Sequence, residues 1–266
     1  MNQPPLAGSS PLIRWAPRVV LLGMVIGIIA ILAVLLPGPL YRLGAYGLGG
    51  AFTMIKYGAF AGIAAVIISL IGLILLLVVK RSQYFVGVLI GIVLGILAWG
   101  IPYMWLKKVQ SVPAIHDITT DTANPPQFQP DVLAQRTETH ARNSAVYGGA
   151  KIAAKQEATY PDIKPMIFKL PTTKVFDAAL QTSKAMGWKL DSENPATGII
   201  EATDITFWFG FTDDVVIRIQ AQDSDTRLDI RSESRIGESD VGKNAQRIRT
   251  FRTALYEQLG LQYPPQ

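Results

Sequence analysis

The sequence predicts three transmembrane α-helices followed by an α+β domain, in which an antiparallel sheet carries two helices on one face. Two observations lead to this prediction. Three long stretches near the N-terminus contain no charged residue, and the last hundred residues alternate with the periods of strands and helices. Charge divides the chain in the same way: residues 1–110 contain no Asp or Glu and only eight of the 25 Lys and Arg, whereas all 20 acidic residues follow. We therefore predict an integral membrane protein with a soluble tail.

The composition excludes several classes of protein. Only 17% of the 266 residues are charged, against roughly 25% in an average soluble domain. The net charge of +5 comes from cations that flank the apolar stretches, because 17 basic residues meet 20 acidic ones after residue 110. We therefore expect no nucleic-acid partner. The absence of Cys excludes disulfide scaffolds, thiolate nucleophiles and Cys-ligated metals, and no motif indicates a cofactor.

Each charge-free stretch is long enough to cross a bilayer, which needs about 20 apolar residues. The predicted spans are residues 19–36, 58–79 and 84–106, within a membrane anchor of residues 1–106. A cleaved signal peptide is the alternative interpretation of the first stretch, because Arg14 and Arg18 precede it. Its length and the two later spans favour a membrane helix. Pro37 and Pro39 are expected to end this helix, because proline removes a backbone donor.

Small residues recur every three or four positions in each predicted span. They are Gly23 and Gly27; Gly58, Gly62, Ala65, Ser69 and Gly72; and Gly87, Gly91 and Gly95. Such stripes allow helix backbones to approach closely in lipid. We expect them to pack the chain's own helix bundle, and a homo-oligomer through these Gly-rich spans is the alternative. No ionisable residue lies within a span, which argues against an ion or proton pathway.

The cations outside the spans give a weak topology signal, because they divide four against four between the two sides. The cluster of Arg14 and Arg18 and the short hairpin at Lys80 and Arg81 favour a cytoplasmic N-terminus. Three crossings then place the C-terminal domain outside the cytoplasm.

The tail is predicted to consist of an extended connector, residues 107–165, and an α+β domain, residues 166–262. In the connector, a short helix is expected after Asp131. The elements expected in the domain are a strand at 166–170, a helix from 172 to about 186, a hairpin of strands 188–192 and 198–203, strands at 214–220 and 227–233, and a final helix that starts near 239–240.

Four segments of the tail resemble a known family. They are residues 112–126, which include the motif IHDITTDTANPP, and residues 160–163, 213–218 and 231–248. They are similar to the domain of unknown function 1499, found in bacterial and plant proteins. The resemblance implies an uncharacterised domain that is often attached to a membrane and often exported, and it transfers no catalytic residue. It supports a bacterial inner-membrane protein with a periplasmic domain. Members anchored by a lipidated cysteine differ from this chain, which has three spans and no Cys.

The strongest candidate for chemistry is the group of His116, Asp117 and Asp121. A His between carboxylates suits a general base or a metal ligand, with a carboxylate that sets its tautomer. The alternative is structural: Asp117, Thr119 and Asp121 would form turn hydrogen bonds that hold the connector on the domain.

Two further groups are candidate binding residues. Arg231, Arg235 and Asn244 surround a glycine-containing turn before the last helix, where free N–H groups and arginines suit an anion. The alternative is that Asp240 caps that helix end. Trp208 and Phe209 belong to the aromatic segment 207–211, which suits an apolar groove or the membrane surface.

Together these observations predict an integral membrane protein that presents a binding or interaction domain in the cell envelope. Its expected partners are the lipid bilayer and an envelope protein or a lipid-like ligand. The alternative is a metal-dependent or hydrolytic enzyme centred on His116, Asp117 and Asp121.

Overall fold

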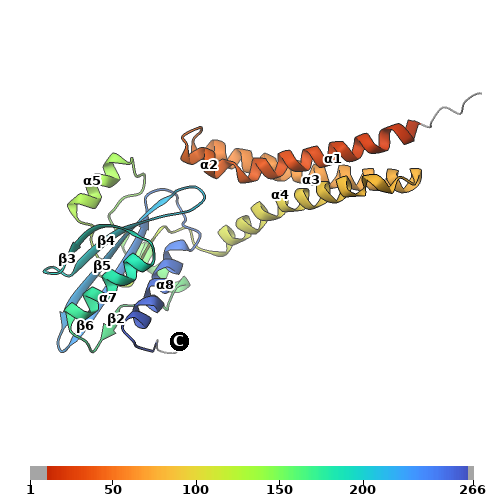
Figure 1. Ribbon diagram of the computed structural model, residues 1–266. Coiled ribbons are helices and arrows are strands. Elements are labelled where there is room, and N and C mark those ends of the chain that lie inside the picture. The colour runs from red at the N-terminus through yellow and green to blue at the C-terminus, as the bar shows by residue number, and fades with distance from the viewer. Residues whose placement is uncertain (1–10, 263–266) are drawn as a thin grey trace, which may run out of the picture. The chain divides into compact units, whose positions relative to one another are not determined.

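The computed structural model describes residues 11–262, so the first ten residues of the predicted anchor lie outside the described part. The chain divides into two compact units, Met1–Lys107 and Lys108–Gln266. Figure 1 shows that the first unit is helical and that the second contains a sheet with helices.

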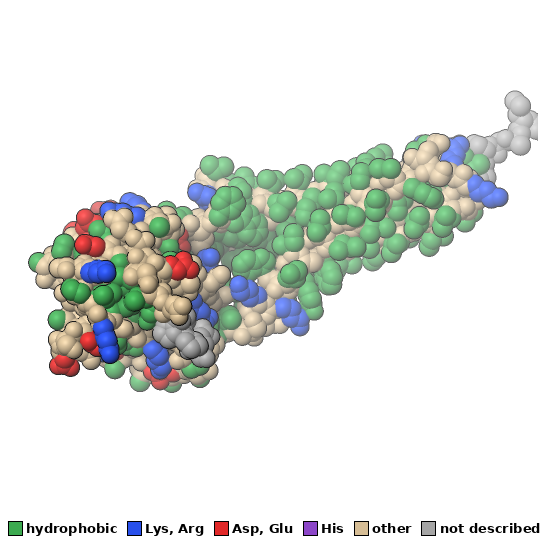
Figure 2. All heavy atoms as spheres, turned by 60° about the horizontal axis from the view of Figure 1, so that its bottom comes forward, with side chains coloured by type: hydrophobic (Ala, Val, Ile, Leu, Met, Phe, Trp, Pro, Cys, Tyr) green, Lys and Arg blue, Asp and Glu red, His purple; other side chains and the backbone are tan. Residues whose placement is uncertain are grey.

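The first unit consists of long apolar helices. They are α1 (Pro11–Leu35), α3 (Leu48–Val79) and α4 (Phe85–Ser111), with the short helix α2 (Pro37–Arg42) and a single 3₁₀ turn, η1 (Ser82–Tyr84). The three long helices coincide with the three charge-free stretches and are long and apolar enough to cross a membrane. Figure 2 shows hydrophobic side chains over their outer surface, as lipid requires.

Proline and a left-handed residue set the helix ends of the first unit. Helix α1 ends at Leu35, just before Pro37, as predicted, but the chain then forms α2 instead of a loop. Helix α3 ends at Val79, because the next residue, Lys80, has a φ of 55°, which breaks the helix and turns the chain towards α4. This helix begins at Leu48, ten residues before the predicted span, because segment 48–57, although it contains the cation Lys56, has no proline to stop it.

The glycine stripes face one another inside the bundle. A side chain at Gly62 would lie 2.7 Å from the carbonyl oxygen of Gly95, and the Ser69 side chain fills the space beside Gly23 and Gly91. The backbones therefore approach too closely for any larger residue. The stripes pack the chain's own helices, as expected, and a homo-oligomer through them stays a prediction.

The second unit contains a six-stranded antiparallel sheet. Its strands are β1 (Asp117–Thr119), β2 (Met166–Phe168), β3 (Lys189–Asn194), β4 (Ile199–Ile205), β5 (Thr212–Gln222) and β6 (Asp225–Ser234). Its helices are α5 (Pro130–Glu138), α6 (Gly149–Thr159), α7 (Thr172–Ala185) and α8 (Lys243–Gln258). The strand order is β1-β6-β5-β4-β3, and β2 also pairs with β6.

The hydrophobic core lies between the sheet and helices α7 and α8, which cover the same face (Figure 1). Val215 and Ile217 of β5 and Leu228 and Ile230 of β6 point into this core and are almost fully buried. Period-two alternation places these apolar side chains on one face of each strand. The predicted antiparallel sheet with two helices on one face is therefore confirmed. We call this side of the sheet the apolar face.

The segment expected to be an extended connector contributes β1, α5 and α6 and belongs to the same compact unit as the sheet. Strand β1 pairs with β6, with Ile118 opposite Ser232. It joins the sheet because Ile115 and Ile118 are buried in the core. On its free edge, the Gln156 side chain exchanges two hydrogen bonds with the backbone of Thr119, at 3.0 and 2.7 Å.

The last helix begins later than predicted. Helix α8 starts at Lys243, not near Ser239, because Val241 and Gly242 have φ values of 55° and 78°. This left-handed backbone cannot continue into a helix.

Candidate functional site

Charged residues gather on the sheet face opposite the apolar face, which we call the charged face. Strand β6 and the residue that follows it alternate basic and acidic side chains on this side, in the order Arg227, Asp229, Arg231, Glu233 and Arg235. The intervening residues point towards α7 and α8. Buried charges are stable only when they are paired, so this face needs counter-charges from other elements.

Arg231 holds the start of the connector segment. Its guanidinium group donates to both carboxylate oxygens of Asp117, at 2.9 and 2.8 Å, and this bidentate geometry is the strongest that arginine makes. It also donates to the carbonyl oxygens of Pro126 and Ala145 and lies over the ring of Phe128, 4.8 Å from its centroid. Arg231 is fully buried. One side chain thus fastens three points of the connector segment to the sheet.

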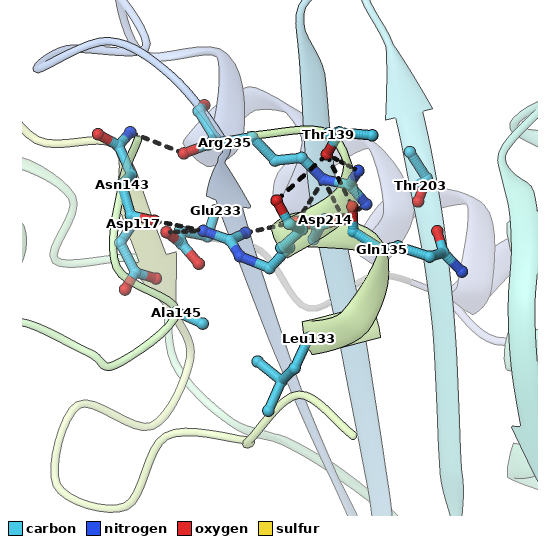
Figure 3. Close-up of polar contacts among 12 residues, drawn as sticks. Asp117, Leu133, Gln135, Thr139, Asn143, Ala145, Thr203, Asp214, Glu233 and Arg235 are labelled. Carbon is cyan, nitrogen blue, oxygen red and sulfur yellow. Dashed lines mark hydrogen bonds and ion pairs between the residues drawn. The ribbon is translucent and has the colours of Figure 1, made fainter. Parts of the chain in front are cut away.

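Arg136 of α5 is the counter-charge for the next acids along this face. It donates to Asp214 of β5 at 2.5 Å and to Glu233 at 2.9 Å. Asp214 also accepts hydrogen bonds from Arg235, which donates to the hydroxyl of Thr139 as well. Figure 3 shows Asp214, Glu233 and Arg235 converging from neighbouring strands beneath Thr139.

A third cluster lies near the other end of β6. Arg218 and Arg227 both donate to Asp121, at 3.1 and 2.7 Å, and both also pair with the buried carboxylate of Asp229. The second carboxylate oxygen of Asp121 accepts the backbone N–H groups of Ala123 and Asn124. Asp121 therefore shapes the turn and pins it to the sheet, which is the predicted structural alternative.

Glu233 carries the strongest electrostatic perturbation on this face. Burial raises its pKa to about 8, Asp117 adds to the rise, and Arg136 and Arg231 oppose it. The ion pair with Arg136 alone would favour the charged form. Burial outweighs it, because Glu233 is fully buried and one of its oxygens has no hydrogen-bond partner.

The three candidate catalytic residues do not share a common site. Asp117 faces Arg231, Asp121 faces Arg218 and Arg227, and the hydrogen bonds described for His116 use its backbone carbonyl, which accepts from Ser234 and Asn244. Adjacent residues of an extended segment point to opposite faces, which separates His116 from Asp117. Between residues 11 and 262, no group of three or more His, Asp or Glu is placed to hold a metal ion.

The candidate anion-binding residues lie inside the protein. Arg231 and Arg235 are paired as described. Asn244 is fully buried, donates to the Ser234 hydroxyl and accepts from Ser232 and Arg247. The carboxylate of Asp240 accepts the N–H groups of Gly242 and Asn244, at 2.8 and 2.7 Å. Asp240 therefore occupies the free donors at this helix end, as the alternative predicted.

The aromatic segment forms the loop between β4 and β5, and we call residues 207–211 the aromatic loop. Phe209 is buried and stacks on Phe211, with ring centroids 4.9 Å apart, and Trp208 packs edge-on against Phe209. Phe207 is 92% exposed. Trp208 and Phe209 were the predicted binding residues, but Phe209 supports the loop from inside. Phe207, of the same predicted segment 207–211, is the most exposed aromatic side chain of the loop.

Sequence reasoning missed two arginines, Arg136 and Arg247. Asp213 pairs with Arg247 of α8, and Asp214 pairs with Arg136 and Arg235. The alternation of charge along β6 was the available signal, because a buried row of this kind requires partners from elsewhere in the chain.

A surface hollow of about 550 Å³ lies between residues 122–127, at the end of the motif IHDITTDTANPP, and residues 146–153. Tyr147 lines it, and burial followed by the charge of Asp117 raises the pKa of its hydroxyl. The same ring contacts Arg231, with the guanidinium carbon 5.8 Å from its centroid.

The fold and the ion pairs define a class. The protein has three candidate membrane helices and an antiparallel α+β domain, and the buried charged residues of its sheet form ion pairs within the domain. The family follows from the sequence of the domain. Residues 117–255, more than half of the chain, match the family model described as Protein of unknown function (DUF1499). The chain belongs to this family, which confirms the predicted resemblance. A search of curated proteins found no match to the chain.

Proposed function

We propose that this chain is a multi-pass protein of the bacterial inner membrane that presents its DUF1499 domain in the periplasm as a binding or interaction domain. Its role would lie in the structure or homeostasis of the envelope. The observation that supports binding over catalysis is the use of the candidate catalytic carboxylates. Asp117 and Asp121 are held by arginines that fasten the connector segment to the sheet. A general acid or base must instead reach its substrate.

The surface offers two places for a partner. The hollow beside Tyr147 suits a small apolar group, and the aromatic loop suits an envelope protein or a lipid-like ligand. Neither place is formed by the buried charged residues of the ion pairs.

The enzyme alternative centred on His116, Asp117 and Asp121 has a direct test. A His116→Ala variant removes the imidazole and keeps the backbone carbonyl that binds Ser234 and Asn244. We expect it to retain the wild-type thermal stability and to complement a deletion strain fully. Loss of complementation at unchanged stability would overturn the binding proposal in favour of a reaction at this residue.

The placement of the domain is tested by labelling single cysteines, because the natural chain contains none. Ser224 lies in the exposed turn between β5 and β6, and Ser82 lies in the exposed hairpin between α3 and α4. A membrane-impermeant maleimide is added to cells whose outer membrane has been permeabilised. The proposal expects labelling of Ser224→Cys in intact cells and labelling of Ser82→Cys only after lysis.

The two variants control for each other, because a single crossing by α4 puts these positions on opposite sides of the membrane. The reverse pattern would place the domain in the cytoplasm and overturn the envelope role. Labelling of both variants in intact cells would contradict the three-span topology.

A further inference from the structure

The aromatic loop and the entry of the chain from the membrane helices lie at the same end of the sheet. Helix α4 ends at Ser111 and β1 begins at Asp117, so residues 112–116 join the last membrane helix to the sheet. Within the sheet, the carbonyl oxygen of His116 accepts from Ser234, and that of Thr212 accepts from the next residue, Arg235. The aromatic loop immediately precedes Thr212. The loop and the tether therefore flank the same end of β6.

A short tether joins this end of the domain to the last candidate membrane helix. Six chain steps separate Ser111 from Asp117 and reach at most about 20 Å when fully extended. Trp105, Lys107 and Lys108 near the end of α4 are residue types that favour the membrane interface. The length of this chain segment therefore limits how far the end of the sheet with the aromatic loop can lie from the end of α4.

The chemistry of the loop fits the membrane interface. Residues 205–212 contain no charged side chain, and they carry Phe207, 92% exposed, and Ile205, 53% exposed. The opposite end of the sheet differs, since the exposed turns there contain Glu193, Asp223 and Asp225. Transfer to the boundary between headgroups and acyl chains is favourable for aromatic side chains and unfavourable for carboxylates.

The Phe207 side chain is held outwards by a rigid base. Thr206 and Phe211 close the loop with two hydrogen bonds, both 2.8 Å long, and the stacked rings of Phe209 and Phe211 fill its inside. Because the loop already has this conformation in the folded domain, its insertion does not carry the entropic cost of ordering it.

We propose that the aromatic loop inserts into the interfacial layer of the bilayer that the chain's own helices cross, and that it docks the domain on the lipid surface. The occupant is phospholipid, at the depth of the headgroups and the first acyl carbons. This proposal rests on membrane anchoring alone and holds for either orientation of the domain, so its test is independent of the topology experiment.

The test places an environment-sensitive fluorophore on Phe207→Cys in the full chain, reconstituted into phosphatidylethanolamine–phosphatidylglycerol vesicles. Ser224→Cys, at the opposite end of the sheet, is the matched control. Lipids with a nitroxide on a shallow acyl carbon should quench the fluorophore at 207 several-fold more strongly than the one at 224. Iodide in the buffer should show the reverse preference.

A reporter at a second position, residue 205, allows Phe207 itself to be substituted. A fluorophore on Ile205→Cys should also be quenched by the lipid nitroxide, and Phe207→Asp in the same chain should reduce this quenching several-fold. Thermal unfolding of each variant checks that the domain stays folded, which the exposure of both side chains favours.

Two outcomes would overturn the proposal. Equal quenching at 207 and 224 would show that the loop stays in water and does not insert into lipid. A blue-shifted fluorophore at 207 that lipid nitroxides do not quench would show that protein, not lipid, covers the loop.

Discussion

The two faces of the sheet are built from the same strands by opposite means. On the apolar face, side chains such as Ile217 and Ile230 pack against α7 and α8 without directional contacts. On the charged face, Arg231 and Glu233 form ion pairs with the connector segment, next to a small apolar cluster of Phe128, Val132 and Val216. Hydrophobic packing accepts many similar shapes, whereas an ion pair requires one partner at one position. The charged face therefore determines where the connector segment lies, and the apolar face provides most of the driving force for folding.

The comparison predicts that losing one partner on the charged face is more damaging than a small change in the core. Arg231→Met should lower the free energy of unfolding by about 3–5 kcal/mol, because it leaves Asp117 as an uncompensated buried charge. Urea unfolding of the full chain in mild detergent, followed by near-UV circular dichroism, measures this loss. Lys174→Met, which removes an exposed cation from α7, is the control and should cost less than about 0.5 kcal/mol.

A double variant sharpens this result. Adding Asp117→Leu to Arg231→Met removes the orphaned carboxylate and should recover part of the lost stability. If the single variant costs less than about 1 kcal/mol, the buried pair does not hold the connector segment, and the contrast between the faces fails.

The next effect is a dependence of stability on pH. The pKa of Glu233 is raised to about 8, so its contribution to stability is fully present below its unfolded value of 4.5 and is lost as pH rises through 8. Unfolding free energies measured from pH 5 to 9 should therefore fall with pH, by a few kcal/mol. Glu233→Gln should flatten this dependence in part, because burial also raises the pKa values of Glu201 and Asp240. An unchanged pH profile in this variant would contradict the assignment.

A smaller effect is expected on the apolar face. Ile217→Val removes one methylene group from a fully buried side chain and should cost about 1 kcal/mol. The same urea titration applies, with an unchanged pH profile expected, since no charge is touched. A cost as large as that of Arg231→Met would mean that the two faces are equally sensitive to substitution.

The smallest effect concerns an ion pair outside both faces. Asp162 accepts two hydrogen bonds from Arg249 of α8, at 2.8 and 2.6 Å, but both side chains are partly exposed. Asp162→Asn should cost less than about 1 kcal/mol near neutral pH, because water competes for the pair. The hydrogen bond from Arg249 lowers the pKa of Asp162, so its contribution is present above 3.8 and is lost as pH falls further. A loss equal to that of Arg231→Met would show that charge, and not burial, decides the cost.

Local sequence patterns predicted most of the fold. The charge-free stretches identified the three long helices, alternation identified β2 to β6, and helical periodicity identified α7, all in the correct order. Strand β1 was missed because the polar residues around it show no apolar alternation, so that only its pairing with β6 makes it a strand. Such pairing leaves no local periodicity.

The candidate site was harder to predict for the same reason. Asp117 and Arg231 were assigned to two separate sites, although they form one ion pair across 114 positions of sequence. Arg136 was not singled out, because a lone arginine in a short helix carries no pattern. Which acid meets which base depends on strand register, and register is determined by the assembled sheet.

The distance in sequence between Asp117 and Arg231 has a consequence for biosynthesis. The connector segment is made first, and its partner strand β6 follows about a hundred residues later. Since synthesis starts at the N-terminus, Asp117 and Asp121 cannot form their ion pairs until Arg227 and Arg231 have been translated, and both carboxylates stay hydrated until then. The domain can close over its charged face only when the chain is nearly complete, so a prematurely terminated chain keeps this segment open to proteases.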